Sequence, residues 1–242
     1  MPQFGRTKVP KAAPTSSDSL GRAIAPSSFL PMTLLNDKQI ARLAEKDIFL
    51  PYVGEKRRTL DNGTKAISYG LSQAGYDIRL SSVEFLVFTM DQWDGGTYEQ
   101  DVKNMDVEPT ATELVETADG SCYFVLPPHC HGLGTSLELI SMPNDVMGIC
   151  QGKSTYARLG LVTNTTPAEP GWNGYFTMCF INPTDFPIRL YANEGVAQFL
   201  LIQLSGNVEQ AYTGAYQNQK AKVTLSQVGS DRLKVGLKVV GS

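Results

Sequence analysis

Short apolar runs dominate the chain from about residue 83 onward, and Gly, Pro, Asn and Asp separate them. Short runs bounded by such residues are typical of strands. The strands predicted from this pattern are Val83–Thr89, Cys122–Leu126, Leu137–Ile140, Val146–Cys150, Tyr175–Ile181, Ile188–Tyr191 and Val196–Gln203. Before all of these strands, Asp61-Asn62-Gly63 is typical of a hairpin turn. Many short strands predict a mostly β, barrel-like domain with one or two short helices.

Helical spacing appears in two segments. In Lys38–Lys46 apolar residues recur at the spacing of one helix face, and Asn36 or Asp37 precedes them as an N-cap. This pattern predicts the one long helix of the chain. A second segment, Lys153–Leu159, follows an apolar run and ends at a glycine. It predicts one or two helical turns.

Two polar pairs stand out because of their spacing. Ser154 and Arg158 lie four residues apart, so they share one face of the short predicted helix. A hydroxyl and a fixed cation that point together suit an anion or substrate site, and they equally suit a solvated surface helix. In the strand Tyr175–Ile181, alternation places Thr177 and Cys179 on one face. The opposite face then carries Phe176, Met178 and Phe180.

Composition limits the class of protein. With 242 residues, 42% hydrophobic and 19% charged, the chain can bury the core of one large or two small domains. A net charge of −3 argues against a nucleic-acid binder that relies on phosphate contacts, but a free nucleotide needs only a local basic pocket. Without an apolar stretch of membrane-spanning length or a signal-peptide core, we expect no membrane partner.

The expected location follows from the same features. We expect a soluble, cytoplasmic protein, or one of the virion or host cytoplasm if a phage encodes it. In such a compartment the cysteines are expected to be reduced, buried thiols. They are Cys122, Cys130, Cys150 and Cys179.

The chain divides into three parts by composition. Residues 1–29 are rich in Pro, Ser, Ala and Gly and contain no acid before Asp18. This composition predicts a disordered basic arm, and the alternative is a docking arm for another subunit or a protein partner. Residues 30–226 are predicted to form the folded domain, and 227–242 a C-terminal tail.

Several motifs are missing from the sequence. A His-x-Glu with a later Pro-Cys-x-x-Cys, which binds zinc in common nucleobase deaminases, is absent, as are a phosphate loop and a dinucleotide fingerprint. His129-Cys130-His131 is the one metal-like cluster, but it follows two prolines and has no acidic or cysteine partners nearby. We therefore predict a turn there, without zinc.

Five segments, in the expected order, resemble the signature segments of dCTP deaminases, a family related to trimeric dUTPases. They are Ser68–Leu80, Lys153–Gly160, Thr166–Gly174, Tyr191–Gln198 and Tyr216–Gln219. The resemblance covers about residues 33 to 226 and implies a distorted β-barrel of the dUTPase type. It also implies a homotrimer with sites between subunits and a metal-independent conversion of dCTP to dUTP and ammonia. Magnesium would accompany the nucleotide triphosphate.

The resemblance assigns roles to single residues. At the reacting base, Ser154 would orient the attacking water and Arg158 would position the general base and the intermediate. Lys153 stands where family members contact a phosphate from a neighbouring chain.

Four further residues are implied to bind the nucleotide. Glu169 would hold the deoxyribose hydroxyl, and Thr177 would line the base. Tyr212 and Gln219 would reach the phosphates as the C-terminal segment closes.

Two positions depart from the family pattern. The family places a catalytic Glu where this chain has Cys179, and an ordinary thiol with a pKa of about 8.5 is a poor base at neutral pH. The nearest acid along the chain is Asp185, in a predicted loop. The family also has a Lys where this chain has Ala215. The catalytic base and one phosphate contact are thus both altered.

Three functions stay open at this point. The first is dCTP deamination, or deamination of a modified deoxycytidine nucleotide. The second is a dUTP pyrophosphatase-like activity that uses Glu169. The third is a catalytically silent homotrimer that senses nucleotides or has a structural role, perhaps in a phage.

Overall fold

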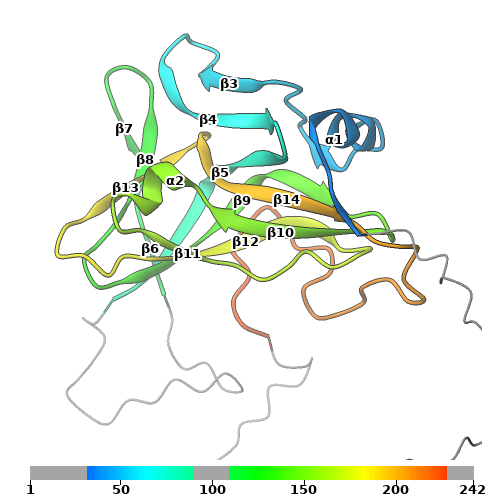
Figure 1. Ribbon diagram of the computed structural model, residues 1–242. Coiled ribbons are helices and arrows are strands. Elements are labelled where there is room, and N and C mark those ends of the chain that lie inside the picture. Colours follow the sequence, from blue (N-terminus) through cyan, green and yellow to red (C-terminus); the bar gives the residue numbers. More distant parts are fainter. Residues whose placement is uncertain (1–31, 90–108, 228–242) are drawn as a thin grey trace, which may run out of the picture.

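The computed structural model describes residues 32–89 and 109–227 (Figure 1). The predicted arm, residues 1–29, lies outside the described residues, and so does the predicted C-terminal tail apart from Gln227. The helices are α1 (Asp37–Ala44) and α2 (Ser154–Ala157). The strands are β1 (Thr33–Leu34), β2 (Phe49–Leu50), β3 (Lys56–Thr59), β4 (Lys65–Ser72), β5 (Gly75–Phe88), β6 (Thr110–Ala111), β7 (Val115–Glu116), β8 (Cys122–Leu126), β9 (His131–Ser141), β10 (Val146–Gly152), β11 (Val162–Asn164), β12 (Asn173–Ile181), β13 (Ile188–Ala192) and β14 (Gly195–Gln203).

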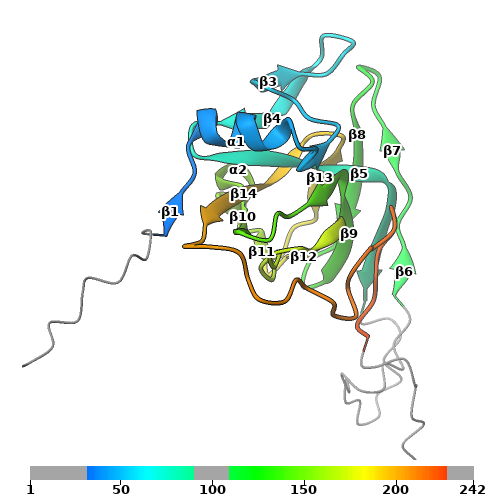
Figure 2. The same cartoon turned by 90° about the vertical axis from the view of Figure 1, so that its right-hand side faces the viewer.

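Strand β5 belongs to both halves of the sheet and connects them. Its first half pairs antiparallel with β4 and β14, and beyond an irregularity between Leu80 and Phe85 its second half pairs with β9 and β6. Strand β14 also pairs with β10 and β1. Strand β9 pairs with β12, which pairs with β11. Strand β13 pairs with β8, which pairs with β7. The strands enclose one core (Figures 1 and 2). This distorted, mostly β barrel confirms the predicted fold class.

Aromatic rings link the strands inside the barrel. Phe49 stacks on Tyr76 with ring centroids 4.2 Å apart, and its edge meets Phe199. Phe199 in turn contacts Phe176 on β12, and Trp172 meets Phe176 at 5.5 Å. Such pairs contribute beyond the apolar area that they bury. The loop that carries Trp172 is therefore anchored to the core.

The predicted elements are largely confirmed. Helix α1 lies within one or two residues of the predicted segment, and Asn36 with Gln39 forms a capping box at its start. The predicted hairpin turn joins β3 to β4, with Gly63 at a φ of 85°. Each predicted strand is present, although β5 begins at Gly75 rather than Val83.

Strand β9 also begins earlier than predicted, because glycines interrupt its apolar pattern. A Cβ at Gly132 would lie 2.6 Å from the Phe85 ring, and one at Gly134 would lie 2.7 Å from Leu80. Both glycines make room for large core side chains of β5. In the sequence these glycines interrupt the apolar pattern and predict the end of a strand. In the barrel they lie within β9 and leave space for the neighbouring side chains.

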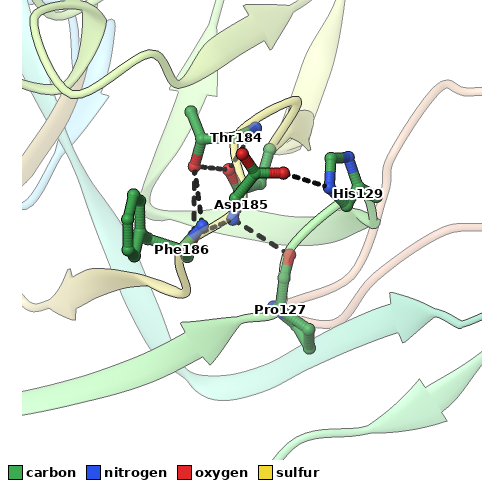
Figure 3. Close-up of polar contacts among 6 residues, drawn as sticks. Pro127, His129, Thr184, Asp185 and Phe186 are labelled. Carbon is green, nitrogen blue, oxygen red and sulfur yellow. Dashed lines mark hydrogen bonds and ion pairs between the residues drawn. The ribbon is translucent and has the colours of Figure 1, made fainter.

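Asn182 connects the end of β12 to the loop before β9. Its side-chain Nδ2 donates to the carbonyl oxygens of Phe186 at 2.7 Å, Pro127 at 3.0 Å and Leu126 at 3.2 Å. Figure 3 shows the two connected segments, with Pro127 and His129 on one side and the turn Thr184–Phe186 on the other. Asn182 is fully buried, so its amide group links the two segments from inside the fold.

We therefore expect Asn182→Ala to lower the free energy of unfolding by about 2 to 4 kcal/mol, since it removes three hydrogen bonds made by a buried side chain. Urea unfolding followed by fluorescence measures this change. Asp185→Ala is the matched control in the same turn, because Asp185 is exposed and contacts only the exposed His129. Equal effects of the two substitutions would contradict the role given to Asn182.

Candidate functional site

The short helix α2 follows β10 directly. Tyr156 is buried and anchors the helix to β13, because its hydroxyl accepts a hydrogen bond from the Tyr191 N–H at 2.9 Å. Gly160, at a φ of 89°, ends the turn that follows. Ser154 and Arg158 are both exposed, and Arg158 Nη1 lies 3.5 Å from the Ser154 carbonyl oxygen. The shared face predicted from their spacing is confirmed.

Lys153, at the N-cap of α2, is buried against a carboxylate. Its Nζ lies 2.5 Å from Asp77 Oδ2, and the two side chains are only 10% and 2% exposed. Lys56 Nζ lies 3.8 Å from the same oxygen. Burial lowers the pKa of Lys153, the cations Lys56 and Arg58 lower it further, and Asp77 opposes the shift. This basic cluster therefore contains three cations around one carboxylate.

A pocket of about 260 Å³ lies on another side of the chain, against β12. It is lined by Thr166, Pro167, Glu169, Trp172, Phe176, Thr177, Tyr212 and Tyr216. The fold thus brings together Glu169, Thr177 and Tyr212, which come from three separate parts of the sequence. Its walls combine aromatic rings with a carboxylate and hydroxyl groups, a lining suited to a small polar ring compound.

The C-terminal segment closes one side of this pocket. Trp172 Nε1 donates to the Tyr216 carbonyl oxygen at 2.8 Å, and the Tyr175 N–H donates to the Gln219 carbonyl oxygen at 3.1 Å. The Thr177 hydroxyl donates to Gln219 Oε1 at 3.0 Å. Gln219 therefore joins the residues around the pocket. Figure 2 shows the segment, in orange to red, along the outside of the barrel.

Cys179 lies on the same face of β12 as Thr177, as the alternation predicts. Its side chain is half-buried, and burial raises the pKa of its thiol. Within the described residues no group hydrogen-bonds to its sulfur. A thiol in this state is protonated at neutral pH and cannot take a proton from water.

Asp185, the nearest acid to Cys179 along the chain, is paired with a histidine instead. Its side chain is 85% exposed, and its Oδ1 lies 2.9 Å from His129 Nε2 (Figure 3).

His131, the second histidine of His129-Cys130-His131, stacks on Phe88 with ring centroids 4.2 Å apart. Among the described residues, no group of three or more His, Cys, Asp and Glu side chains could hold a metal ion.

The predicted site residues therefore form two groups within one chain. Lys153, Ser154 and Arg158 lie at α2. Glu169, Thr177 and Tyr212 line the β12 pocket. Gln219 is hydrogen-bonded to Thr177, and Cys179 lies two residues further along β12 on the same face. None of the α2 residues lines that pocket.

Neither of the two helices in the described part of the chain is long and apolar enough to cross a membrane.

The sequence reasoning missed Asp77, Lys56 and Arg58. Asp77 lies inside one of the five segments that resemble the family, so the segment itself was a signal, although the residue's role was not. Lys56 and Arg58 lie in a charged stretch without any distinctive pattern.

Comparison with known proteins adds an independent observation. The model of a family described as dCTP deaminase-like matches residues 34–204. The dCTP deaminase of Alcanivorax borkumensis is 39% identical over 199 residues, which are 80% of this chain and 98% of that protein. This chain belongs to the dCTP deaminase-like family. The family predicted from the five segments is thereby confirmed.

A second curated relative has a similar sequence identity and coverage. The dCTP deaminase of Pseudomonas aeruginosa (strain UCBPP-PA14) is 40% identical over 198 residues, again 80% of this chain and 98% of that protein. Among solved structures, the 2'-deoxycytidine 5'-triphosphate deaminase of Agrobacterium tumefaciens aligns with a TM-score of 0.47 and 16% identity. That alignment covers 71% of this chain and 47% of the other. The native EIAV dUTPase aligns with a TM-score of 0.32 and 21% identity over 44% of this chain and 95% of its own.

At Gly174 the C-terminal segment of this dCTP deaminase-like protein passes close to the backbone of β12. It has a φ of 150°, and a Cβ there would lie 2.6 Å from the Gln219 backbone nitrogen. We expect Gly174→Ala to push residues 216–219 away from β12. Amide hydrogen exchange should then become faster in that segment, with little change in α1.

Gly206→Ala is the matched control, because a Cβ at Gly206 meets no atom within 4 Å. Unchanged protection of residues 216–219 in Gly174→Ala would show that the contact with β12 does not hold the segment.

Proposed function

We propose that this protein binds deoxycytidine triphosphate in sites shared between the chains of a homotrimer. The reaction that we propose for these sites is hydrolytic, metal-independent deamination of dCTP to dUTP and ammonia, at a rate limited by Cys179. The observation that carries the proposal is the division of the family residues between α2 and the β12 pocket. A single chain holds two incomplete halves, and a neighbouring chain can supply the missing half.

The β12 pocket would bind the nucleoside. Glu169 would accept a hydrogen bond from the deoxyribose hydroxyl, and the Thr177 hydroxyl would exchange its bond to Gln219 for one to the cytosine ring. Tyr212 and Gln219 would face the phosphates. Because the C-terminal segment is fixed by Trp172, closure over the nucleotide would need only a local rearrangement.

Helix α2 of a neighbouring chain would supply the groups that act on the base. Ser154 is exposed and can orient a water molecule toward C4 of cytosine, while Arg158 can stabilise the charge that develops during attack. Anchoring of α2 by Tyr156 and Lys153 holds both side chains in place. A rigid helix would keep these two side chains oriented toward the base, which favours the reaction.

Magnesium would arrive as part of the substrate. Mg²⁺ commonly keeps several waters and binds through phosphates, with only one or two protein carboxylates. Glu169 is the one carboxylate in the lining of the pocket, and its proposed partner is the deoxyribose hydroxyl. The ion would therefore be held by the triphosphate and water, without a carboxylate from this pocket.

The proton transfers are the weak step. Water must lose a proton as it attacks C4, and the leaving ammonia must gain one, so one group that accepts and then donates a proton can serve both. Burial raises the pKa of the Cys179 thiol, which makes it a poor acceptor at neutral pH. General acid–base help is typically worth about 10² to 10⁴ in rate. Nucleotide binding without turnover is therefore the second candidate function.

We expect Cys179→Glu to raise the rate of ammonia release from dCTP by about 10² to 10⁴, because it introduces a carboxylate of the length found in the family. The assay compares the two proteins at the same dCTP and magnesium concentrations. Cys179→Gln is the matched control, because it has the same size without a base and should stay as slow as the original.

Other outcomes of this assay are equally informative. Fast ammonia release by the unaltered protein would contradict the limit ascribed to Cys179. Release of pyrophosphate instead of ammonia would favour the pyrophosphatase-like reading. If dCTP binds and neither variant reacts, the protein binds nucleotides without turnover.

The homotrimer gives a separate prediction. The mass in solution, measured by light scattering at micromolar concentration, should be close to three times the chain mass of 26.4 kDa. A monomer would contradict the shared site, since one chain does not bring α2 to the β12 pocket. A dimer would contradict threefold assembly.

A further inference from the structure

Strand β9 changes register at the same place against both of its main neighbours. On the β12 side, the step from Tyr175 to Thr177 lies opposite the longer step from Leu139 to Thr135, so β9 carries extra residues there. On the β5 side, the register shifts directly beyond the residue opposite Ser136. Residues 136–138 are called the β9 bulge below. A bulge interrupts the ladder and redirects the side chains around it.

The hydroxyl of Ser136 bridges the β9 bulge. Its Oγ accepts a hydrogen bond from the Phe176 N–H at 2.8 Å and donates one to the Glu138 carbonyl oxygen at 2.7 Å. Ser136 is fully buried. Buried backbone groups need hydrogen-bond partners, and one hydroxyl can both accept and donate. The Ser136 side chain therefore serves one backbone donor and one backbone acceptor where the ladder is interrupted.

The β9 bulge is fixed to β5 by the side chain of Glu138. This carboxylate accepts hydrogen bonds from the Arg79 backbone N–H at 2.9 Å and from Arg79 Nε at 2.7 Å. The Glu138 side chain is fully buried, and that of Arg79 is 13% exposed. Breaking a buried pair of this kind is strongly unfavourable. Ser136 thus connects a fixed point on β5 with the backbone of β12.

Phe176 carries this connection to the β12 pocket. Its ring meets Trp172 at 5.5 Å and Phe199 at 5.0 Å between centroids. Phe176 and Trp172 line the pocket, and so does Thr177, which follows Phe176 directly in the chain. A displacement of the Phe176 backbone would therefore move neighbouring parts of one pocket wall together.

We propose that Ser136 is a positioning residue for nucleoside binding, whose hydroxyl holds the Phe176 backbone where it shapes the β12 pocket. Ser136 is not part of the pocket lining, so it acts through Phe176. Apolar packing of the Phe176 ring is non-directional, whereas a hydrogen bond to its N–H fixes the direction of the backbone. This inference rests on the proposed function, because it names a residue that sets the affinity of that site.

The test measures binding of dCTP and of deoxycytidine to the full-length protein by calorimetry, at a temperature at which each variant is folded. Ser136→Ala should weaken the binding of both ligands about 10-fold, because it removes the buried hydrogen bonds that hold the pocket wall. The two ligands should be affected equally, since the wall contacts the nucleoside that they share.

Ser81→Ala is the matched control. Ser81 is also buried, and its hydroxyl accepts a hydrogen bond from the Val83 N–H at 3.2 Å within β5. Because Ser81 neither lines the pocket nor bonds to Phe176, its substitution should leave both affinities unchanged. Ser136→Cys gives the same comparison if Ser136→Ala does not fold, because it keeps the size of the side chain and replaces the hydroxyl by a weakly bonding sulfur.

Amide hydrogen exchange tests the path of the effect. In Ser136→Ala or Ser136→Cys the Phe176 amide should exchange faster, while the Ile40 amide, which donates to the Asn36 carbonyl oxygen in α1, should not change. Unchanged protection of the Phe176 amide would overturn the inference, because the amide would then not depend on the Ser136 hydroxyl.

The binding outcomes distinguish this inference from the proposed function. If the unaltered protein binds no dCTP, the proposed function fails, and the inference fails with it. If the unaltered protein binds dCTP and the Ser136 variants bind it equally well, the inference alone is overturned, even if their melting temperatures are lower. Weaker binding of dCTP with unchanged binding of deoxycytidine would also overturn it, because the nucleoside wall would then be intact.

Discussion

The buried ion pair between Lys153 and Asp77 joins α2 to β5, the strand on which both halves of the barrel depend. Asp77 lies in the half of β5 that pairs with β4 and β14, while the other half pairs with β9. A charge buried to this degree needs its partner, since an unpaired carboxylate in the interior is strongly unfavourable. The position of α2, and with it the direction of Ser154 and Arg158, is therefore coupled to the centre of the sheet.

The same barrel keeps the two halves of the candidate site apart. Strand β12 and its preceding loop carry Glu169, Thr177 and Cys179, and the aromatic contacts of Trp172 anchor that wall to the core. The α2 residues lie outside this pocket. A rigid barrel cannot fold one group onto the other, so the proposed function needs a second chain to complete the site. In the proposed function, nucleotide binding would therefore depend on assembly of the chains.

Family membership and catalytic capacity are separate properties in this protein. The match to a dCTP deaminase covers 80% of the chain. The resemblance of the signature segments implies that Cys179 stands where the family has its general base. Its burial raises the thiol pKa rather than lowering it, and Asp185 is engaged by His129. In the proposed function, the scaffold would therefore keep its nucleotide contacts while the proton-transfer step is weak.

The sequence by itself determined the elements, the family and most candidate residues. Alternation alone correctly assigned Thr177 and Cys179 to one face of β12, and the Asn36 cap marked α1, because these features depend on neighbours along the chain. Only the tertiary structure decided that Lys153 is buried against Asp77, and that Lys56 lies near the same carboxylate. Those contacts join residues far apart in the sequence, and strand register, which no local pattern encodes, brings them together.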